Sequence, residues 1–305
     1  MTFLKKYPIP IAGLILSLFA LGNLLQSYSN RIRLAIGFLA FILYAIYVLK
    51  LLFLNTQIKS EFENPVIASV FPTFTMASML FAVYLKVFFP ALGNAVWYAA
   101  VLGHCVLIVW FSCKFLPHFA IKKVFPSWYI VYVGIVVASV TAPAVKQLLI
   151  GQIAFWFGFL TYLCLIPIVC YRIIKVKEIP EPAQPTLVIL SAPGSLLLAG
   201  YLNTFPEKTT AMVYLLLVFS LVFYVIAIGC LPKLVRLKFT PGYSAFTFPL
   251  VISALAVKLT GAYFKRGGAL LTVITKTEEI VAVVIVFWVL VCYSVFLFQP
   301  NKNSQ

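Results

Sequence analysis

Long uninterrupted apolar runs constrain the fold of this chain more than any other feature. The first extends from Pro8 to about residue 25, and similar runs follow along the whole sequence. Only 10% of the 305 residues are charged and 63% are hydrophobic, so polar side chains are too few to cover a soluble domain. Lipid cannot satisfy free backbone groups, so a chain in lipid forms helices or a closed barrel. Because the runs are continuous rather than alternating, the sequence predicts an all-α integral membrane protein.

Ten apolar runs are separated by short polar or charged loops. They lie near residues 8–28, 34–49, 65–85, 89–113, 126–145, 147–171, 185–203, 209–232, 241–264 and 280–298. The first run is too long for a signal peptide, and no small-residue cleavage site follows it. We therefore expect ten transmembrane helices in a single domain over residues 1–305.

The basic residues indicate how these spans are oriented. With alternating spans, 14 of the 23 Lys and Arg fall on the side of both termini and nine on the other side. Because cytoplasmic loops carry the larger share of basic residues, we expect both termini of a multi-pass cell-membrane protein to be cytoplasmic. The smaller set consists of Arg31, Arg33, Lys86, Lys146, Lys208, Lys258, Lys265, Arg266 and Lys276.

The odd-numbered spans share a repeated pattern of helix-breaking residues. Each opens with a proline, and these prolines are 57, 61, 59 and 56 residues apart: Pro8, Pro65, Pro126, Pro185 and Pro241. A second break follows, at Pro72, Gly134, Pro193 and Pro249, and at a shorter offset at Gly13 in the first span. A regular period of this size is typical of repeated supersecondary units, here five helical hairpins.

The second break has a structural consequence. A proline inside a helix removes a backbone hydrogen bond and kinks the helix, and the freed groups are tolerated at membrane depth where they face protein or a water-filled cavity. We expect the five odd-numbered helices to form a quasi-five-fold ring around a central pore, with the even-numbered helices outside. The alternative is that the breaks and the small residues after them only serve helix packing.

The charged residues narrow what such a pore would carry. Aspartate is absent, and the seven glutamates are expected in loops or at helix ends: Glu61, Glu63, Glu178, Glu181, Glu207, Glu278 and Glu279. Cation pathways and proton-coupled carriers usually depend on intramembrane carboxylates, so their absence favours anions. A basic surplus on both sides would raise the local anion concentration, although a basic surface near anionic lipid explains it equally well.

A few reactive side chains fall inside the apolar runs. Lys258 either extends to the interface or contacts an anion, and His104 makes either an interhelical hydrogen bond or a proton relay. The six cysteines lack metal-ligand spacing and are expected to be buried structural thiols: Cys105, Cys113, Cys164, Cys170, Cys230 and Cys292. No acid lies near His104 or His118 in the sequence, which argues against an enzyme and against a metal or other cofactor.

A bulky side chain is the remaining means of closing a pore that has no charged residue at its centre. The residues just before the breaks are Ala12, Phe71, Val133, Ala192 and Phe248. A phenyl ring at a constriction would plug or dewet the path, so Phe71 and Phe248 are candidate gates. Alternatively, both rings simply pack against lipid or neighbouring helices.

Several short motifs, in this order, resemble the tellurite-resistance/dicarboxylate transporter family. The strongest is Y-S-A-F-T-F-P-L at Tyr243–Leu250 in the ninth span. The others are Y-P-I-P at Tyr7–Pro10, N-P at Asn64 and Pro65, P-S-W-Y at Pro126–Tyr129 and A-P-G at Ala192–Gly194. The family includes bacterial TehA proteins and the plant guard-cell slow anion channels, and the similarity covers nearly the whole chain.

The resemblance implies a ring of five helical hairpins, a trimer with one pore in each subunit, and a phenylalanine that occludes the pore. The F-T-F-P match assigns that role to Phe248 rather than Phe71. The chain departs from the family in two ways: it lacks long terminal extensions that would carry phosphorylation control, and its first span has an early glycine.

Taken together, these features predict an anion channel or channel-like transporter for small monovalent anions such as chloride and nitrate. The alternative is a secondary transporter or exporter of C4-dicarboxylates, sulfite or tellurite-related oxyanions. A divalent substrate favours a fixed cation in the pathway, and Lys258 is the residue inside an apolar run that offers one.

Overall fold

The computed structural model describes residues 2–54, 59–265 and 268–299, and nearly all of them are helical. These three ranges contain no β-strand, in agreement with the predicted all-α fold. The even-numbered spans are long helices, which we call the outer helices: α3 (Asn30–Phe53), α7 (Pro90–Phe115), α10 (Leu148–Tyr171), α12 (Thr210–Leu234) and α14 (Gly268–Phe298). Short elements lie before and between them: α1 (Thr2–Lys6), η1 (Ile121–Lys123) and the π-helical η3 (Arg172–Val176).

The odd-numbered spans, which we call the inner segments, consist of shorter elements. The first is α2 (Ile11–Leu25) together with the Pro8–Pro10 turn; the second is α5 (Pro65–Val70) and α6 (Thr73–Lys86); the third is α8 (Trp128–Tyr132), η2 (Gly134–Val136) and α9 (Val137–Val145); the fourth is η4 (Glu181–Ser191) and α11 (Ala192–Thr204); the fifth is η5 (Pro241–Phe246) and α13 (Thr247–Tyr263). The helix type or continuity changes at or within three residues of each predicted break residue, Gly13 included.

Hydroxyl side chains satisfy backbone carbonyl groups at two of these breaks. Thr73 Oγ1 donates to the carbonyl of Val70 at 2.7 Å, directly across Pro72. Thr247 Oγ1 donates to the carbonyl of Ser244, also at 2.7 Å, where η5 gives way to α13. A broken helix leaves carbonyl groups without their usual N–H partners, so these local bonds remove part of the cost of the break inside a membrane.

Gly13 in the first inner segment has the same place in its helix as Pro249 has in α13. This residue lies in the first turn of α2, and the chain turns earlier, at Pro8–Pro10. The glycine also serves a close approach, because a Cβ at Gly13 would lie 3.2 Å from both Cβ and Oγ of Ser244. The glycine thus lets the first and fifth inner segments pack tightly.

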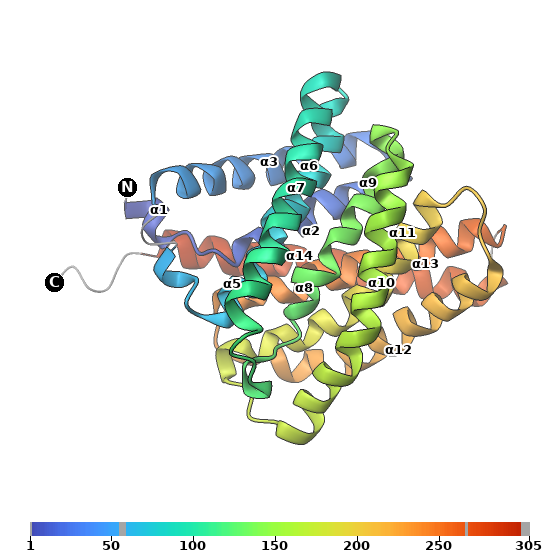
Figure 1. The fold of residues 1–305 in the computed structure, drawn as a ribbon. Coiled ribbons are helices and arrows are strands. Elements are labelled where there is room, and N and C mark those ends of the chain that lie inside the picture. Colours follow the sequence, from blue (N-terminus) through green and yellow to red (C-terminus); the bar gives the residue numbers. More distant parts are fainter. Residues whose placement is uncertain (1, 55–58, 266–267, 300–305) are drawn as a thin grey trace.

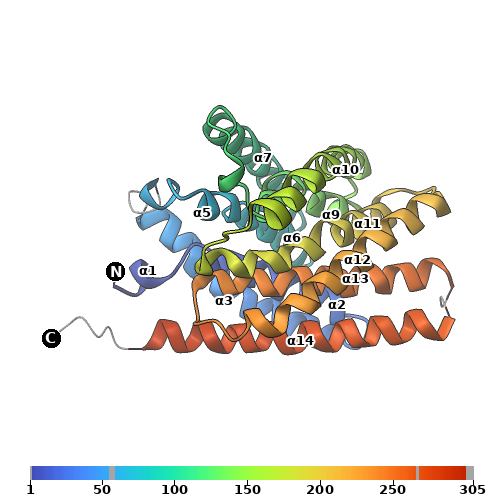
Figure 2. The same cartoon turned by 90° about the horizontal axis from the view of Figure 1, so that it is seen from below.

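The inner segments form the core, and the outer helices surround them. In their most apolar windows, the fourth inner segment is 89% buried and the second and fifth are 67% buried, whereas the outer helices are 22–39% buried. The two ribbon views agree, with α7, α10 and α14 on the outside (Figures 1 and 2). Large apolar side chains such as Leu102, Leu160 and Val225 are exposed on outer helices, as expected of surfaces that face lipid.

The inner segments contact one another in a closed circuit. α2 contacts α6, α6 contacts α9, α9 contacts α11, α11 contacts α13, and α13 contacts α2 again. Each inner segment also packs against the outer helix that follows it in sequence. A core built in this way positions one residue from each inner segment around a common space.

Within the described residues, eight helical stretches are long and apolar enough to cross a membrane, which supports a multi-pass membrane protein. They are residues Asn30–Phe53, Pro65–Lys86, Pro90–Phe115, Leu148–Val176, Glu181–Thr204, Thr210–Leu234, Pro241–Tyr263 and Gly268–Phe298. Two shorter apolar helices, Ile11–Leu25 and Gly134–Val145, fall where the first and fifth predicted spans lie. They are shorter because their segments begin with a turn or a separate helix.

The last outer helix corrects the prediction that every glutamate lies in a loop or at a helix end. α14 begins at Gly268, so Glu278 and Glu279 are inside it, and both are buried. The sequence suggests a break here because charged residues cluster. The helix continues through the cluster because Glu279 is paired: Lys258 Nζ lies 2.5 Å from Oε1, and the Tyr28 hydroxyl donates to Oε2 at 2.5 Å.

The two ends of the described chain lie together, which agrees with an even number of spans. Lys6 Nζ donates to the Gln299 carbonyl at 2.6 Å, and the rings of Phe3 and Phe298 are 6.1 Å apart. Both ends are on the same side of the molecule (Figure 1). Arg266, one of the nine basic residues assigned to the opposite side, lies outside the described residues.

The cysteines correct the expectation of buried thiols. All six lie on outer helices; three are exposed and three are partly buried, and none forms a disulfide within the described residues. The exposed ones are Cys105, Cys113 and Cys164, and the partly buried ones are Cys170, Cys230 and Cys292. The error arises because an apolar run does not reveal which face of an outer helix points away from the core.

Candidate functional site

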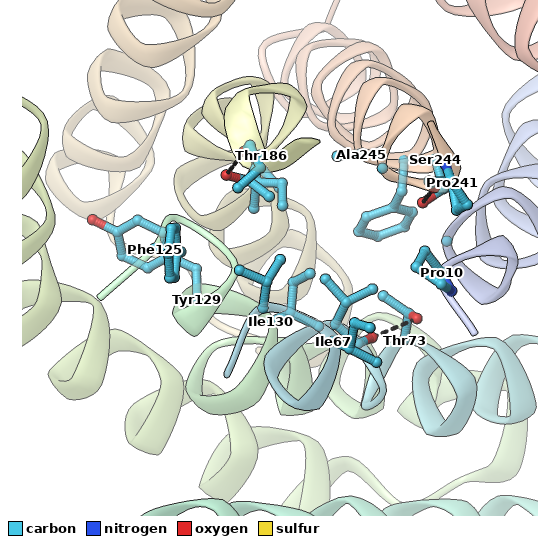
Figure 3. Close-up of a pocket in the computed structure, with 18 of the residues that line it drawn as sticks. Pro10, Ile67, Thr73, Phe125, Tyr129, Ile130, Thr186, Pro241, Ser244 and Ala245 are labelled. Carbon is cyan, nitrogen blue, oxygen red and sulfur yellow. Dashed lines mark hydrogen bonds between the residues drawn. The ribbon is translucent and has the colours of Figure 1, made fainter. Parts of the chain in front are cut away.

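The first cavity lies among the N-terminal halves of the inner segments and has a volume of about 640 Å³. All five inner segments line it. Figure 3 shows Pro10, Ile67, Ile130, Thr186 and Ala245, one residue from each segment, arranged around the same space. Because Pro8 and Pro10 follow α1 directly, this cavity lies on the side of the molecule that carries both termini.

The second cavity, of about 310 Å³, lies among the C-terminal halves of the same five segments. The residues that line it are Ala20, Asn23, Gln26, Arg33, Leu80, Val83, Val137, Val140, Thr141, Ala144, Leu196, Asn203, Phe248, Ile252, Leu255 and Leu259. Arg33 comes from the outer helix α3, and the others come from the inner segments or the end of α2. This cavity lies on the side away from the termini.

Two residues, Leu196 and Phe248, line both cavities. Both are buried, with 2% and 7% of their surface exposed, and they come from neighbouring segments, α11 and α13. They therefore separate the two cavities. Sequence reasoning identified Phe248 but missed Leu196, because the repeat aligned Phe248 with Ala192, one helical turn before the leucine.

The predicted break residues lie close to the first cavity with one exception. Gly13, Gly134, Pro193 and Pro249 line it. Pro72 is buried and is not among the lining residues, although Val70 and Thr73 on either side of it are. The repeat thus brings four of its five break residues to one space.

Phe71 occupies a different environment from Phe248. Its ring packs against Phe62, with centroids 4.7 Å apart, and against Phe74 at 6.1 Å. It is partly buried and is not among the residues that line either cavity. Of the two candidate gating rings, Phe248 is therefore the one among the cavity-lining residues, and its role as a gate stays a prediction.

The lining of the first cavity is weakly polar. Among its hydroxyl groups, Thr186 Oγ1 donates to the Ala183 carbonyl at 2.6 Å, as Thr73 does to its own backbone. A hydroxyl that already donates its hydrogen has none left for an anion, so the free hydroxyl donors of this lining are few and include Tyr129 and Thr240. The one charged side chain among the lining residues is Glu61, and buried Lys50 lies 3.6 Å from its carboxylate.

Lys258 is engaged by other groups and is not among the lining residues of either cavity. Besides Glu279, its ammonium group contacts the Leu24 carbonyl at 2.9 Å and lies 4.8 Å from the centre of the Tyr28 ring. About a quarter of its side chain is exposed. Its charge is therefore largely balanced by α14.

His104 makes interhelical hydrogen bonds, which confirms the first of the two interpretations. Its Nδ1 lies 2.7 Å from Thr75 Oγ1 on α6, and its Nε2 lies 3.2 Å from the Val131 carbonyl on α8. The ring is fully buried, and Gly134 leaves room for it, because a Cβ there would lie 3.0 Å from Cε1 of the ring. His118 is exposed at the end of the α7 region.

No group of three or more His, Cys, Asp or Glu suited to a metal ion occurs among the described residues. The ionisable residue that sequence reasoning overlooked is Arg33. It lies near the start of α3, five residues after the predicted end of the first span, and the sequence suggests only a loop charge there. No signal in the sequence shows that this loop folds back over the C-terminal end of α2.

Comparison with known proteins identifies a family model and two relatives. The model describes a voltage-dependent anion channel and matches residues 6–296, which include all five inner segments. Two proteins of Methanocaldococcus jannaschii, each named an uncharacterized transporter, are 24% identical to this chain over 253 and 254 residues. Each similarity covers 74% of this chain and 73% of the relative.

Proposed function

The chain belongs to the voltage-dependent anion channel family, and we propose that it passes small monovalent anions, such as chloride and nitrate, through a pore that Phe248 occludes. The observation that carries this proposal is that Phe248, with Leu196, lines both cavities and stands between them. Members of such a family are channels or transporters rather than enzymes. The motifs that resemble the tellurite-resistance/dicarboxylate transporter family agree with this family assignment.

The pore architecture is part of the proposal. The ten helices comprise the eight long spans and the two shorter apolar helices, and the inner segments form a quasi-five-fold ring around one pore in each subunit of a trimer. The closed circuit of contacts and the shared lining of both cavities support this arrangement. The termini are cytoplasmic, so the first cavity is the inner mouth and the second is the outer mouth in the cell membrane.

Anion selectivity follows from the charges near the path. Glu278 and Glu279 are buried, but they belong to an outer helix and are not among the residues that line the cavities. At the inner mouth Glu61 is balanced by Lys50. The second halves of the broken helices also begin near the middle of the path, and helix N-termini favour negative charge. A permeating anion therefore meets no uncompensated carboxylate.

Weak binding and a narrow width would set the preference among anions. An ion that is held tightly cannot leave, so a wall with few free donors suits conduction. Passing between Phe248 and Leu196 requires an ion to lose part of its water. This cost is lowest for weakly hydrated monovalent anions.

Replacement of the occluding ring tests the proposal. Phe248→Ala is expected to raise anion current in oocytes well above the level of the unmodified protein, with a reversal potential that follows the anion gradient. Phe71→Ala is the matched control, because it removes the same ring at the equivalent repeat position, away from both cavities. If Phe248→Ala reaches the cell surface and the current stays at background, the gate assignment is refuted.

A second candidate function is a secondary transporter or exporter of C4-dicarboxylates, sulfite or tellurite-related oxyanions. Two observations favour it: both relatives are named transporters, and Arg33 places a fixed cation in the second cavity. Saturable uptake of such a substrate by proteoliposomes, driven by a proton gradient and without electrical current of matching size, would establish the carrier. Current that grows linearly with voltage and is independent of pH would exclude it.

A further inference from the structure

The second cavity contains a buried cation whose charge no neighbouring carboxylate balances. Among the described residues that line this cavity, Arg33 is the one charged side chain. Only 8% of its surface is exposed. Burial of an unpaired charge is costly, so an arginine in such a place requires either a counter-ion or a function.

The guanidinium group is held in a defined position. Its Nε donates to Asn23 Oδ1 at 3.0 Å, and its central carbon lies 4.4 Å from the centre of the Tyr84 ring. The Tyr84 hydroxyl in turn donates to the Phe19 carbonyl at 2.9 Å. Cation–π contact with an anchored ring fixes the plane of the guanidinium, so the group is preorganised.

Two glycines make this support possible. A Cβ at Gly22 would lie 2.3 Å from the Tyr84 hydroxyl, and a Cβ at Gly37 would lie 2.3 Å from Cε1 of the same ring. Any larger residue at either position would displace the ring under Arg33. Gly22 in α2 and Gly37 in α3 therefore leave the space in which the Tyr84 ring supports Arg33.

The terminal nitrogens of Arg33 are available. No carboxylate of the described residues forms an ion pair with Arg33, and its Nε donates to Asn23; the Tyr84 hydroxyl beside the guanidinium can accept one further N–H, which leaves the other terminal N–H groups for a ligand. Lys258 differs, because Glu279 and the Leu24 carbonyl engage it. Arg33 thus presents N–H donors to the cavity, whereas Lys258 does not.

The polar groups nearby suit a small oxyanion. Asn23 and Gln26 line the same cavity, and the Asn23 oxygen already faces Arg33, which leaves the amide N–H groups as donors. The Thr141 hydroxyl has no free donor for an anion, since it accepts from Trp97 Nε1 and donates to the Val137 carbonyl. Two parallel N–H groups of a guanidinium match two oxygens of one anion better than they match a spherical halide.

We propose that Arg33, positioned by Asn23 and Tyr84, forms an anion-binding site in the second cavity that takes small monovalent oxyanions such as nitrate before they reach Phe248. This inference rests on the proposed anion pathway and adds a substrate preference to it. The site lies in series with the constriction, because Phe248 and Leu196 form one wall of the same cavity. It concentrates anions on the side away from the termini.

The first test measures current in planar bilayers as a function of nitrate concentration on the second-cavity side, in the Phe248→Ala background. Arg33→Gln is expected to raise the half-saturating nitrate concentration about tenfold, the effect of losing one charge-assisted interaction, while the maximal current is kept. Arg31→Gln is the matched control: it removes the same charge from the exposed start of the same helix and should change the value less than twofold. Chloride should be affected less than nitrate.

The second test does not depend on conduction. Nitrate is titrated into the purified full-length protein in detergent, with the thermal unfolding midpoint as the readout. Nitrate should stabilise the unmodified protein and Arg31→Gln, but not Asn23→Asp, which retains Arg33 and supplies it with an internal carboxylate. If nitrate binding persists in Asn23→Asp and Arg33→Gln, the site is refuted. If nitrate binds through Arg33 but Phe248→Ala carries no current, the site stands and the proposed conduction fails.

Discussion

Variants of the ion pair between Lys258 and Glu279 test whether Lys258, in the middle of an inner segment, has a structural role or contacts the permeating anion. Glu279 is 5% exposed and Lys258 is 26% exposed, and their charged atoms are 2.5 Å apart. If Lys258 is a structural partner of α14, its removal should destabilise the protein without changing conduction. If Lys258 contacts the permeating anion, its removal should change conduction more than stability.

The structure provides an approximate magnitude. Breaking a buried pair usually costs about 3–5 kcal/mol, because the remaining charge is buried without a partner. The cost is smaller here, since Tyr28 still donates to Glu279 and Lys276 Nζ lies 3.4 Å from the same carboxylate. We expect Lys258→Met to lower the free energy of unfolding by about 2 kcal/mol, and Glu279→Gln by about the same amount.

The double variant Lys258→Met/Glu279→Gln completes the test. Because neither charge is then left alone, it should be less stable than the unmodified protein by no more than about 1 kcal/mol, which gives a coupling energy of about 3–4 kcal/mol. Unfolding by SDS in mixed micelles measures these values, and bilayer current in the Phe248→Ala background measures conduction. Additive losses of stability, or a current reduced more than about threefold by Lys258→Met alone, would refute the structural role.

Three further predictions follow from the residues around the path. Leu196→Ala should raise anion current in the same direction as Phe248→Ala but by less, since it removes the smaller partner at the constriction; an unchanged current in oocytes would contradict this. Gly134→Ala should destabilise the protein by about 1–3 kcal/mol in SDS unfolding, because its Cβ would lie 2.8 Å from Met76 Sδ; full stability would show that this site tolerates bulk. Glu278→Gln should leave the reversal potential in a chloride gradient unchanged, because the carboxylate is not among the lining residues, and a shift toward cation permeability would place it on the path.

The proline and glycine repeat explains how much of the fold the sequence could predict. Break residues act locally, through a missing N–H group or a missing side chain, so their effect can be predicted without knowing the neighbours. For this reason the positions of the breaks could be predicted from the sequence, whereas the choice of Phe248 over Phe71 as the occluding ring rests on the family resemblance and stays a prediction. The close approach of Gly13 to Ser244 in another segment is a further role that the repeat does not predict.

The remaining features depend on contacts between distant parts of the chain. In the sequence Glu278 and Glu279 indicate a helix boundary, because the ion pair of Glu279 with Lys258 and its hydrogen bond from Tyr28 involve residues more than twenty and about 250 positions away. The place of Arg33 depends on where Tyr84 lies between the first two helices. Such pairings leave no periodic pattern, and a single sequence does not reveal them.

The series Phe248→Ala, Phe248→Leu and Phe248→Trp, compared by single-channel recording in planar bilayers, tests the central claim most directly. If the side chain at this position closes the only path between the two cavities, unitary anion conductance and the largest permeant anion should both increase as its volume decreases, with Ala highest and Trp silent. Equal conductance in all three variants, or current carried mainly by cations, would contradict the account.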